Sequence, residues 1–336
     1  MRALLPAVLL LAACASTPAR TATVERRVMS MGTSLDLAVE AADRGAALAA
    51  SEKAVEALER AEARLSTWRE DTELARLNRA PAGEPQRLSP ALARDLAAAK
   101  RCWEETAGAF DPGVGALVRA WGLREGGRRP DEAERRAAMA AGDFSSLRLE
   151  DGGIAVRGRG DLVLEEGGWG KGAGLGDALA TLREAGVSRA SLDFGGQVAV
   201  LGAGWRIPVA DPRRRERQVA VLSIDGGSVS TSGNSERGIV VDGVRLGHIL
   251  DPRTGEPAPD FGSLTVWTDD PLRADCLSTG LYILGPEWAL AWADAHPGVE
   301  VLVLRTDGDR LRALASPGLR GRLKPLDPEL EIEIGR

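Results

Sequence analysis

The sequence predicts an α+β fold, a single two-lobed domain with largely antiparallel sheets and flanking helices. Segments with apolar residues at helical spacing alternate with short strand-like segments bounded by turns. The chain contains no internal repeat and no low-complexity linker after its first residues. Its 336 residues are enough for one large domain or two modest ones.

The first half of the chain predicts a pair of strands followed by helices. Residues 24–39 alternate loosely between apolar and polar side chains, which predicts two strands. Apolar residues recur at helical spacing over 41–65, and a short helix begins within 71–74, with the aspartate or the threonine there as its cap. A further helix covers 89–106, and strands surround a glycine turn within 143–163.

The second half predicts a helix, a set of strands, a second helix and a last strand. A glycine-rich passage over 167–176 opens a helix that runs to about residue 185. A strand at 189–194 follows, and strands and turns dominate 198–250. A helix over 271–284 begins with Asp-Pro and is followed by glycine, and a last strand at 299–304 precedes a polar tail.

The N-terminus has the features of a bacterial export signal. Arg2 precedes the apolar run 3–11, which is too short for a membrane-spanning helix because that takes about 20 apolar residues. The run ends in Leu-Ala-Ala-Cys, which resembles a lipobox with Cys14 as the lipid-bearing residue; an ordinary secretory peptide with a chance cysteine is the alternative. We therefore expect a protein anchored by lipid on the periplasmic side of a bacterial membrane, with a signal peptide at 1–13, a tether at 14–23 and a domain at 24–325.

Charge and composition exclude several classes of function. The formal net charge is -6, so the chain lacks the basic surface that nucleic-acid binding normally needs. Two histidines are too few for a multi-histidine metal site. None of the three cysteines forms a CxxC pair, which removes zinc and thioredoxin-type chemistry. Cys102 and Cys276 either pair or remain two separate buried thiols, and their spacing alone does not decide this.

The glycine-rich passage 167–172 has the composition of a phosphate cradle. Free N–H groups and the dipole at a helix N-terminus favour anions. Gly172 stands where a P-loop needs Ser or Thr, so that motif is absent. A dinucleotide-binding turn with Asp193 as its ribose-binding acid is a weaker alternative, because that motif belongs early in a βαβ unit. A tight turn without a ligand is the structural alternative.

Further positions carry groups suited to chemistry. His248 lies at a predicted strand end before a Pro/Gly turn, an exposed and rigid position for a base or a phosphate contact. Asp275 and Thr279 are four residues apart on one predicted helix, so their oxygens share a face and suit Mg²⁺. Trp68 is suited to stacking on a flat ring. A surface histidine, a polar stripe and a core tryptophan are the structural alternatives.

Taken in order, these segments resemble the FAD:protein FMN transferases, the ApbE-like flavin transferases formerly called thiamine-biosynthesis lipoproteins. The likeness runs from about Met29 to about Gly285. A histidine followed three residues later by Asp-Pro-Arg-Thr-Gly, at 248–255, is highly specific in that order. The other segments are Met31-Gly32-Thr33, Leu65-Ser66-Thr67-Trp68, Glu73 to Asn78, Gly108 to Pro112, Gly167 to Gly172, Gly195-Gly196, Thr231-Ser232-Gly233, and Ala274-Asp275 with Leu277-Ser278-Thr279.

The resemblance implies an ApbE-like domain and a role for each matching residue. The FAD pocket would be lined by Met31, Trp68, Ala109, Phe110 and Asp111. Further contacts with FAD would come from Glu165 and Lys171. Mg²⁺ would be held by the Gly168 carbonyl, the Asp275 carboxylate and the Thr279 hydroxyl. The FAD phosphates would lie close to His248, with a backbone contribution from Ile249.

This chain departs from the family pattern around the glycine-rich turn. The family usually reads Asp-Leu-Gly-Gly-Ile-Ala-Lys-Gly, whereas this chain has Glu165 and Glu166 at the first two positions and Trp169 at the fifth. Gly176 replaces a frequent acid, although Asp177 is adjacent. These departures bear on the adenosine contacts rather than on the metal site.

The implied reaction moves FMN from FAD to a protein hydroxyl. Mg²⁺ on the pyrophosphate would neutralise charge and activate AMP as the leaving group. A base, His248 or Asp275, would take the proton from a Ser or Thr hydroxyl of the acceptor. We expect acceptors among flavoprotein subunits of membrane redox complexes. An FAD pyrophosphatase would use the same residues, and a non-catalytic FAD-binding lipoprotein is a further alternative.

Overall fold

The computed structural model describes residues 21–234, 238–241, 243–308 and 310–335. The predicted signal peptide and Cys14 lie outside these residues, as does most of the tether. Within the described ranges, every helix is either too short or too polar to cross a membrane.

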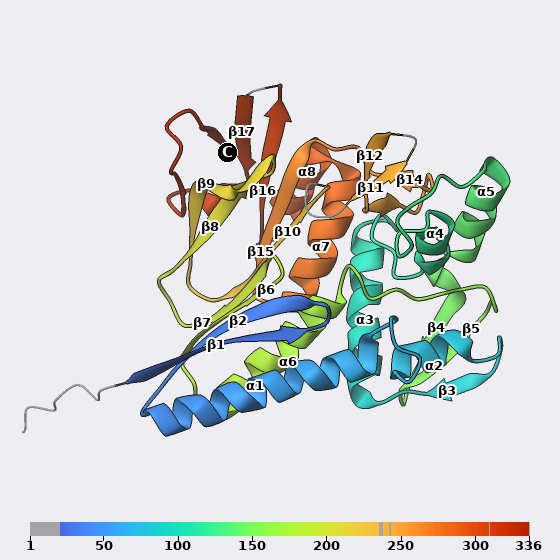
Figure 1. Cartoon of the computed structure of the whole chain (residues 1–336), viewed down its shortest axis with the longest axis horizontal. Coiled ribbons are helices and arrows are strands. Elements are labelled where there is room, and N and C mark those ends of the chain that lie inside the picture. Colours follow the sequence, from blue (N-terminus) through green and yellow to red (C-terminus); the bar gives the residue numbers. More distant parts are fainter. Residues whose placement is uncertain (1–20, 235–237, 242, 309, 336) are drawn as a thin grey trace, which may run out of the picture.

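A nine-stranded sheet forms the centre of the molecule (Figure 1). Neighbouring strands are antiparallel throughout, except for the parallel pair at the β17–β19 edge. The predicted fold class, α+β with largely antiparallel sheets, is confirmed. In spatial order the strands are β1 (Ala22–Ser30), β2 (Thr33–Ala41), β6 (Arg189–Phe194), β7 (Gln197–Leu201), β10 (Gly227–Gly233), β15 (Gly262–Thr268), β16 (Val299–Asp307), β17 (Arg310–Ala315) and β19 (Glu331–Ile334).

Helices cover one face of the central sheet. Alternate residues of β2 (Leu35, Leu37 and Val39) are buried against α1 (Arg44–Leu65) and α6 (Gly170–Glu184). Helices α7 (Pro271–Leu284) and α8 (Pro286–Ala295) continue this layer over β10, β15 and β16. A small sheet of β8 (Trp205–Asp211), β9 (Arg214–Ile224) and β18 (Leu323–Pro325) packs on the other face.

The second lobe lies beside the helical layer, to the right of the central sheet in Figure 1. One buried cluster runs from β15 and β16 through α7 and α3 into this lobe, so the two lobes share a core. The lobe contains α2 (Glu73–Arg79), β3 (Pro85–Arg87), α3 (Pro90–Glu105), α4 (Gly115–Ala120), α5 (Glu132–Ala141), β4 (Leu147–Glu150) and β5 (Ile154–Arg157). Two hairpins flank it, β11 (Gly238–Val241) with β12 (Val244–Gly247), and β13 (Leu250–Asp251) with β14 (Glu256–Pro257).

Caps explain where the predicted helices begin. The Thr72 hydroxyl accepts from Ala75 N at 3.1 Å, so the threonine rather than Asp71 caps α2. Ser89 caps α3, and Asp270 caps α7 by accepting from Leu272 N at 2.9 Å. Each of these two helices has proline in its first turn, where no intrahelical N–H bond is lost.

Several predicted boundaries differ from the observed ones. The long helix begins at Arg44 instead of residue 41, because β2 extends to Ala41 and Asp43 is the helix cap. Strand β1 begins at Ala22, within the predicted tether, and β19 pairs with β17 beyond residue 325. The strand at 299–304 is therefore not the last. Within 143–163, residues 144–146 form a 3-10 turn and only β4 and β5 are strands. Both described cysteines, Cys102 and Cys276, are buried free thiols.

Candidate flavin-transfer site

The glycine-rich turn meets the middle of α7 at the start of α6. A side chain on Gly168 would come within 3.3 Å of both Phe110 Cε2 and Thr279 Oγ1. Gly172 is closer still, because an added Cβ would lie 2.4 Å from Pro271 O. The two glycines therefore let the backbone of the turn approach the helix face that carries Asp275 and Thr279.

Asp275 is buried at the point where α6 begins. Its side chain is 4% exposed, and its Oδ2 accepts from Gly172 N at 2.9 Å. Lys171 Nζ lies 3.4 Å from Oδ1. A backbone N–H at a helix start and a lysine therefore both face this carboxylate. We call Gly168, Lys171, Asp275 and Thr279 the α6–α7 cluster.

Thr279 lies one turn after Asp275, and its hydroxyl is 3.4 Å from the Asp275 carbonyl. The intervening Ser278 points to the sheet, where its hydroxyl contacts Ser230 at 3.1 Å and Ser232 at 2.9 Å. Helix α7 therefore has two polar sides. Ser278 binds the serines of β10, and Asp275 and Thr279 present oxygen atoms to the glycine-rich turn. Carboxylate, hydroxyl and carbonyl oxygens are the donors that Mg²⁺ prefers, so the α6–α7 cluster fits this ion. Within the described residues no group of three or more His, Cys, Asp or Glu side chains is placed to hold a metal.

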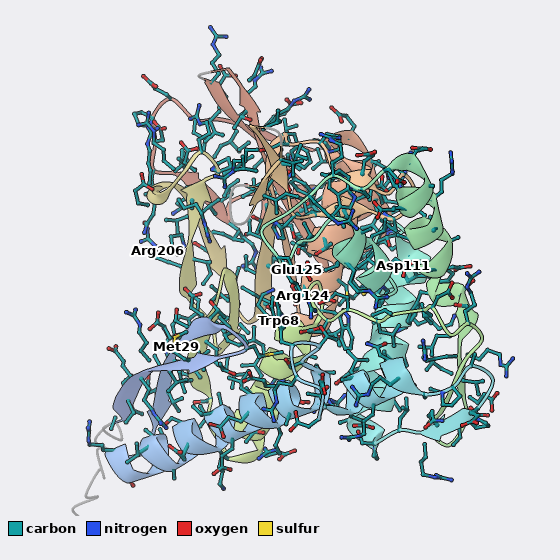
Figure 2. All side chains as sticks on the ribbon, turned by 45° about the vertical axis from the view of Figure 1, so that its right-hand side comes forward. Met29, Trp68, Asp111, Arg124, Glu125 and Arg206 are labelled. Carbon is teal, nitrogen blue, oxygen red and sulfur yellow. The ribbon has the colours of Figure 1, made fainter. Side chains whose placement is uncertain are left out.

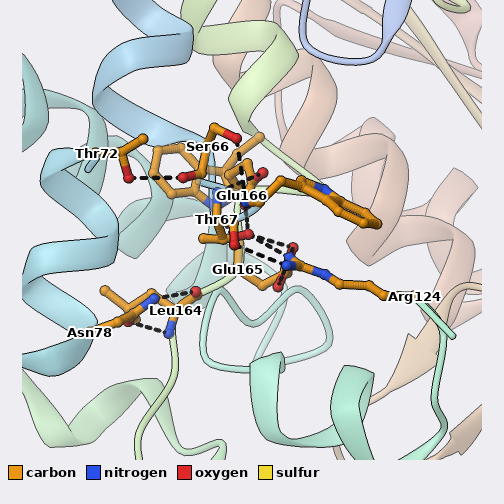
Figure 3. Close-up of polar contacts among 10 residues, drawn as sticks. Ser66, Thr67, Thr72, Asn78, Arg124, Leu164, Glu165 and Glu166 are labelled. Carbon is orange, nitrogen blue, oxygen red and sulfur yellow. Dashed lines mark hydrogen bonds and ion pairs between the residues drawn. The ribbon is translucent and has the colours of Figure 1, made fainter. Parts of the chain in front are cut away.

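A second polar group lies at the end of α1, where two consecutive carboxylates meet one threonine (Figure 3). Thr67 N donates to Glu166 Oε1 at 3.1 Å, and the Thr67 hydroxyl contacts both Glu165 and Glu166. Arg124 Nη2 donates to the two Glu165 oxygens at 2.6 and 2.7 Å. Arg124 also lies over the Trp68 ring, 4.3 Å from its centroid. We call Thr67, Trp68, Arg124, Glu165 and Glu166 the Arg124 cluster.

Neighbouring hydrogen bonds hold the backbone of this cluster (Figure 3). Asn78 donates to Leu164 O at 2.9 Å and accepts from Leu164 N at 2.8 Å, which fixes the segment before Glu165. The Thr72 hydroxyl donates to Ser66 O at 2.8 Å, which fixes the segment before Thr67. The buried Trp169 indole donates to Glu165 O at 2.8 Å.

Burial and charge act in opposite directions on Glu165. Burial and the neighbouring Glu166 charge raise the pKa of Glu165 to about 7, although Arg124 and Thr67 favour its ionised form.

Trp68 in the same cluster is 68% exposed. Figure 2 shows Trp68, Arg124 and Glu125 between the central sheet and the second lobe. An exposed indole with one face against a guanidinium is a suitable platform for a flat ring.

Met31 reaches the start of α6 from the turn between β1 and β2. Its φ of 46° lies in the left-handed region, which is unusual for a residue with a side chain. Met31 N donates to Glu62 at 3.1 Å, and its methyl group would be 3.4 Å from a side chain on Gly170. The turn therefore packs a flexible apolar side chain beside the glycine-rich passage.

Ala109, Phe110 and Asp111 lie behind the turn and are buried or nearly so. The Phe110 ring lies beside Gly168. The Asp111 carboxylate accepts from Gly113 N at 2.6 Å, Trp103 Nε1 at 3.2 Å and Phe144 N at 3.4 Å. Burial raises the pKa of Asp111 to about 7 against these hydrogen bonds. The hydrogen bonds of its side chain thus hold its own loop in place.

His248 lies on the turn between β12 and β13, half-buried. Gly247 before it packs directly on the Asn234 side chain at the end of β10. Ile249 is buried, and its carbonyl accepts from Ala258 N at 2.8 Å. This places His248 at the end of the sheet where β10 ends and β15 begins, while Asp275 lies in the middle of α7. Asp193 lies on the outer face of β6 across from Asp36 and is separate from the glycine-rich turn.

Known proteins match this chain over most of its length. The model of the ApbE family matches residues 31–303. The chain belongs to the ApbE family. Curated relatives include an FAD:protein FMN transferase of Klebsiella pneumoniae (strain 342), 32% identical over 95% of each chain. Another, from Rhodobacter capsulatus, is 35% identical over 76% of this chain and 50% of its own length.

Solved ApbE structures share the fold. The flavin transferase ApbE from Vibrio cholerae superposes with a TM-score of 0.80 at 27% identity, covering 90% of this chain and 100% of its own. The ApbE protein of Thermotoga maritima has a TM-score of 0.78 at 29% identity, and the match covers 84% of this chain and 94% of its own. These likenesses confirm the predicted ApbE-like domain.

The departures from the ApbE sequence pattern are accommodated locally. Glu166 is buried, but Thr67 binds its carboxylate, so the extra charge does not lack a partner. Glu165 is bound by Arg124, a residue that the sequence did not single out. The Asp177 carboxylate is bound by Arg64 and Arg94 at 2.8 and 2.7 Å, away from the turn. The adjacent acids Glu165 and Glu166 indicate that a cation lies nearby. No sequence pattern, however, shows which of the 43 lysines and arginines it is.

Proposed function

We propose that this protein cleaves FAD and transfers its FMN half to a Ser or Thr hydroxyl of an acceptor protein, releasing AMP. The observation that carries the proposal is the approach of the glycine-rich turn to Asp275 and Thr279 in a chain of the ApbE family. The names of the curated relatives, which are FAD:protein FMN transferases, support the same activity.

FAD would lie across both polar groups. The flat flavin or adenine ring would use the exposed face of Trp68 and the apolar side chains of Met31 and Phe110. The pyrophosphate would lie at the start of α6, where the helix dipole and Lys171 favour an anion.

Mg²⁺ would be held by Gly168, Asp275 and Thr279, and when bound it lowers the charge on the pyrophosphate and makes AMP a better leaving group. His248 or Asp275 would accept the proton of the attacking hydroxyl. We favour His248, because the Asp275 carboxylate already faces Gly172 N and Lys171. The hydroxyl oxygen bonds to the FMN phosphorus as the phosphorus–oxygen bond to AMP breaks.

The test is incubation of the purified protein with FAD, Mg²⁺ and acceptor peptides that contain Ser or Thr. Mass spectrometry should find one FMN on the acceptor and an equal amount of AMP. Free FMN with AMP, and no modified acceptor, would identify an FAD pyrophosphatase. Bound FAD without any cleavage would identify a flavin-binding protein.

We also propose that Cys14 carries a lipid and holds the protein on the periplasmic side of a bacterial membrane. The apolar run and the Leu-Ala-Ala-Cys sequence support this location. It would place the site near flavoprotein subunits of membrane redox complexes, the acceptors we expect. Cys14→Ala should abolish labelling by a fatty-acid probe, and unchanged labelling would contradict the anchor.

A further inference from the structure

Arg124 is held in place by two other segments of the chain. Its Nη1 donates to Thr67 O at 2.9 Å, and its Nη2 donates to both oxygens of Glu165. The Trp68 ring covers the guanidinium at 4.3 Å. Arg124 comes from the loop after α4, whereas Thr67 follows α1 and Glu165 precedes α6. The side chain of Arg124 is 27% exposed and that of Glu165 is 13% exposed, so solvent screens this pair less than a surface ion pair.

The position of this cation matters because two carboxylates stand beside each other. Glu165 and Glu166 are consecutive, and both contact the same Thr67 hydroxyl. The glycine-rich turn begins directly after them, and Gly168 is only three residues from Glu165. Two negative charges without a counter-ion here would repel an anionic pyrophosphate in a partly buried site, where Coulomb interactions are stronger than in water. Because burial raises the pKa of Glu165 to about 7, this repulsion is expected above that pH, and the binding measurements below are made there.

Arg124 does not reach the groups that would act on the phosphates. Within the described part of the chain, its hydrogen bonds go to Thr67 and Glu165, and not to Asp275 or Thr279. Its removal should therefore change the binding of FAD more than the chemical step.

We propose that Arg124 is a positioning residue that sets the affinity for FAD by neutralising Glu165, an inference that rests on flavin transfer as the proposed function. The Trp68 ring and the Thr67 carbonyl fix the guanidinium against the carboxylate. The cation thereby makes the acidic start of the turn compatible with an anionic substrate.

The first test compares Arg124→Gln, which removes the charge, with Arg124→Lys, which keeps it. Quenching of flavin fluorescence gives the Kd for FAD without any acceptor, and transfer to an acceptor peptide gives KM and kcat. Arg124→Gln should raise Kd and KM about tenfold to a hundredfold, the usual weight of a charged hydrogen bond, and leave kcat within about twofold. Arg124→Lys should lie between this variant and the wild type.

Arg128→Gln is the matched control. Arg128 follows in the same loop, is exposed and pairs with Glu134 on the surface. Its replacement should leave the Kd for FAD unchanged. Thermal unfolding of each variant separates a loss of affinity from a loss of folded protein.

A double-mutant cycle shows whether Arg124 acts through Glu165. The factor by which Arg124→Gln raises the Kd for FAD should be at least about fivefold smaller in a Glu165→Gln background than in the wild type. The inference would be overturned if Arg124→Gln raised the Kd for FAD by the same factor in both backgrounds. It would also be overturned if Arg124→Gln and Arg124→Lys raised this Kd equally. Arg124→Lys takes the place of Arg124→Gln in the cycle if the latter does not fold. A wild type that binds FAD but transfers nothing would overturn the proposed function alone, because Kd is measured without turnover.

Discussion

The α6–α7 cluster and the Arg124 cluster are built in different ways. Asp275 and Thr279 are one turn apart on a regular helix, and Gly168 meets them from a turn that has room only for glycine. Arg124, in contrast, joins Glu165 across 41 residues and reaches it from an irregular loop. The first arrangement depends on local geometry, whereas the second depends on how the two lobes pack. We infer that the first serves the chemistry of the phosphates and the second serves the binding of FAD.

The largest effect should follow removal of the charged oxygen donor in the α6–α7 cluster. Asp275→Ala should lower Mg²⁺-dependent transfer by about a thousandfold or more, because it deletes a group that acts on transition-state charge. Asp294→Asn, which changes an exposed carboxylate on α8, is the control. Near wild-type transfer by Asp275→Ala at ordinary Mg²⁺ concentrations would place the metal elsewhere.

His248 should be next in size. General-base assistance is commonly worth ~100-fold or more, so His248→Ala should slow transfer by that amount while the Kd for FAD stays unchanged. Transfer is followed by mass spectrometry of the acceptor at saturating FAD. A variant that loses FAD binding instead would make His248 a phosphate contact rather than a base.

Thr279 should show a smaller effect that depends on Mg²⁺. Thr279→Val keeps the shape of the side chain and removes the hydroxyl, so half-maximal activity should need about tenfold more Mg²⁺. Thr279→Ser keeps the oxygen and should behave like the wild type. A Mg²⁺ titration of transfer rates distinguishes the three proteins, and identical curves for Val and Thr would remove this residue from the metal site.

The parts of the α6–α7 cluster each have a local signal in the sequence, and the resemblance to the ApbE family is what placed Gly168 with Asp275 and Thr279. The helix over 271–284 has an N-cap, a first-turn proline and a terminal glycine, and its periodicity fixes which residues share a face. The Arg124 cluster has no such signal, since a salt bridge between distant segments is decided by tertiary packing. The same limit explains β19, which the sequence predicts as part of a polar tail: Glu331–Ile334 is a strand because it pairs with β17.

Asp111 gives a prediction about stability rather than activity. Its pKa rises to about 7 in the folded protein from an ordinary value of 3.8, so the folded state binds more protons than the unfolded state between these values. The free energy of unfolding should therefore fall as the pH rises from about 4 to about 7, by up to about 4 kcal/mol from this group.

Asp111→Asn removes the titrating group and keeps an oxygen that accepts from Gly113 N. Urea unfolding at several pH values should show a flatter dependence for this variant over that window. A wild-type free energy of unfolding that rises from pH 4 to pH 7, with the same slope in Asp111→Asn, would show that Asp111 is ionised in the folded state.

The division between binding and chemistry is tested most directly by measuring one pair of quantities on two variants. The Kd for FAD and the transfer rate at saturating FAD are determined for Asp275→Asn and for Arg124→Gln. We predict that Asp275→Asn keeps the wild-type Kd and loses transfer, and that Arg124→Gln has a raised Kd and keeps transfer at saturation. Parallel loss of both quantities in both variants would contradict the account, because the two clusters would then act as one site.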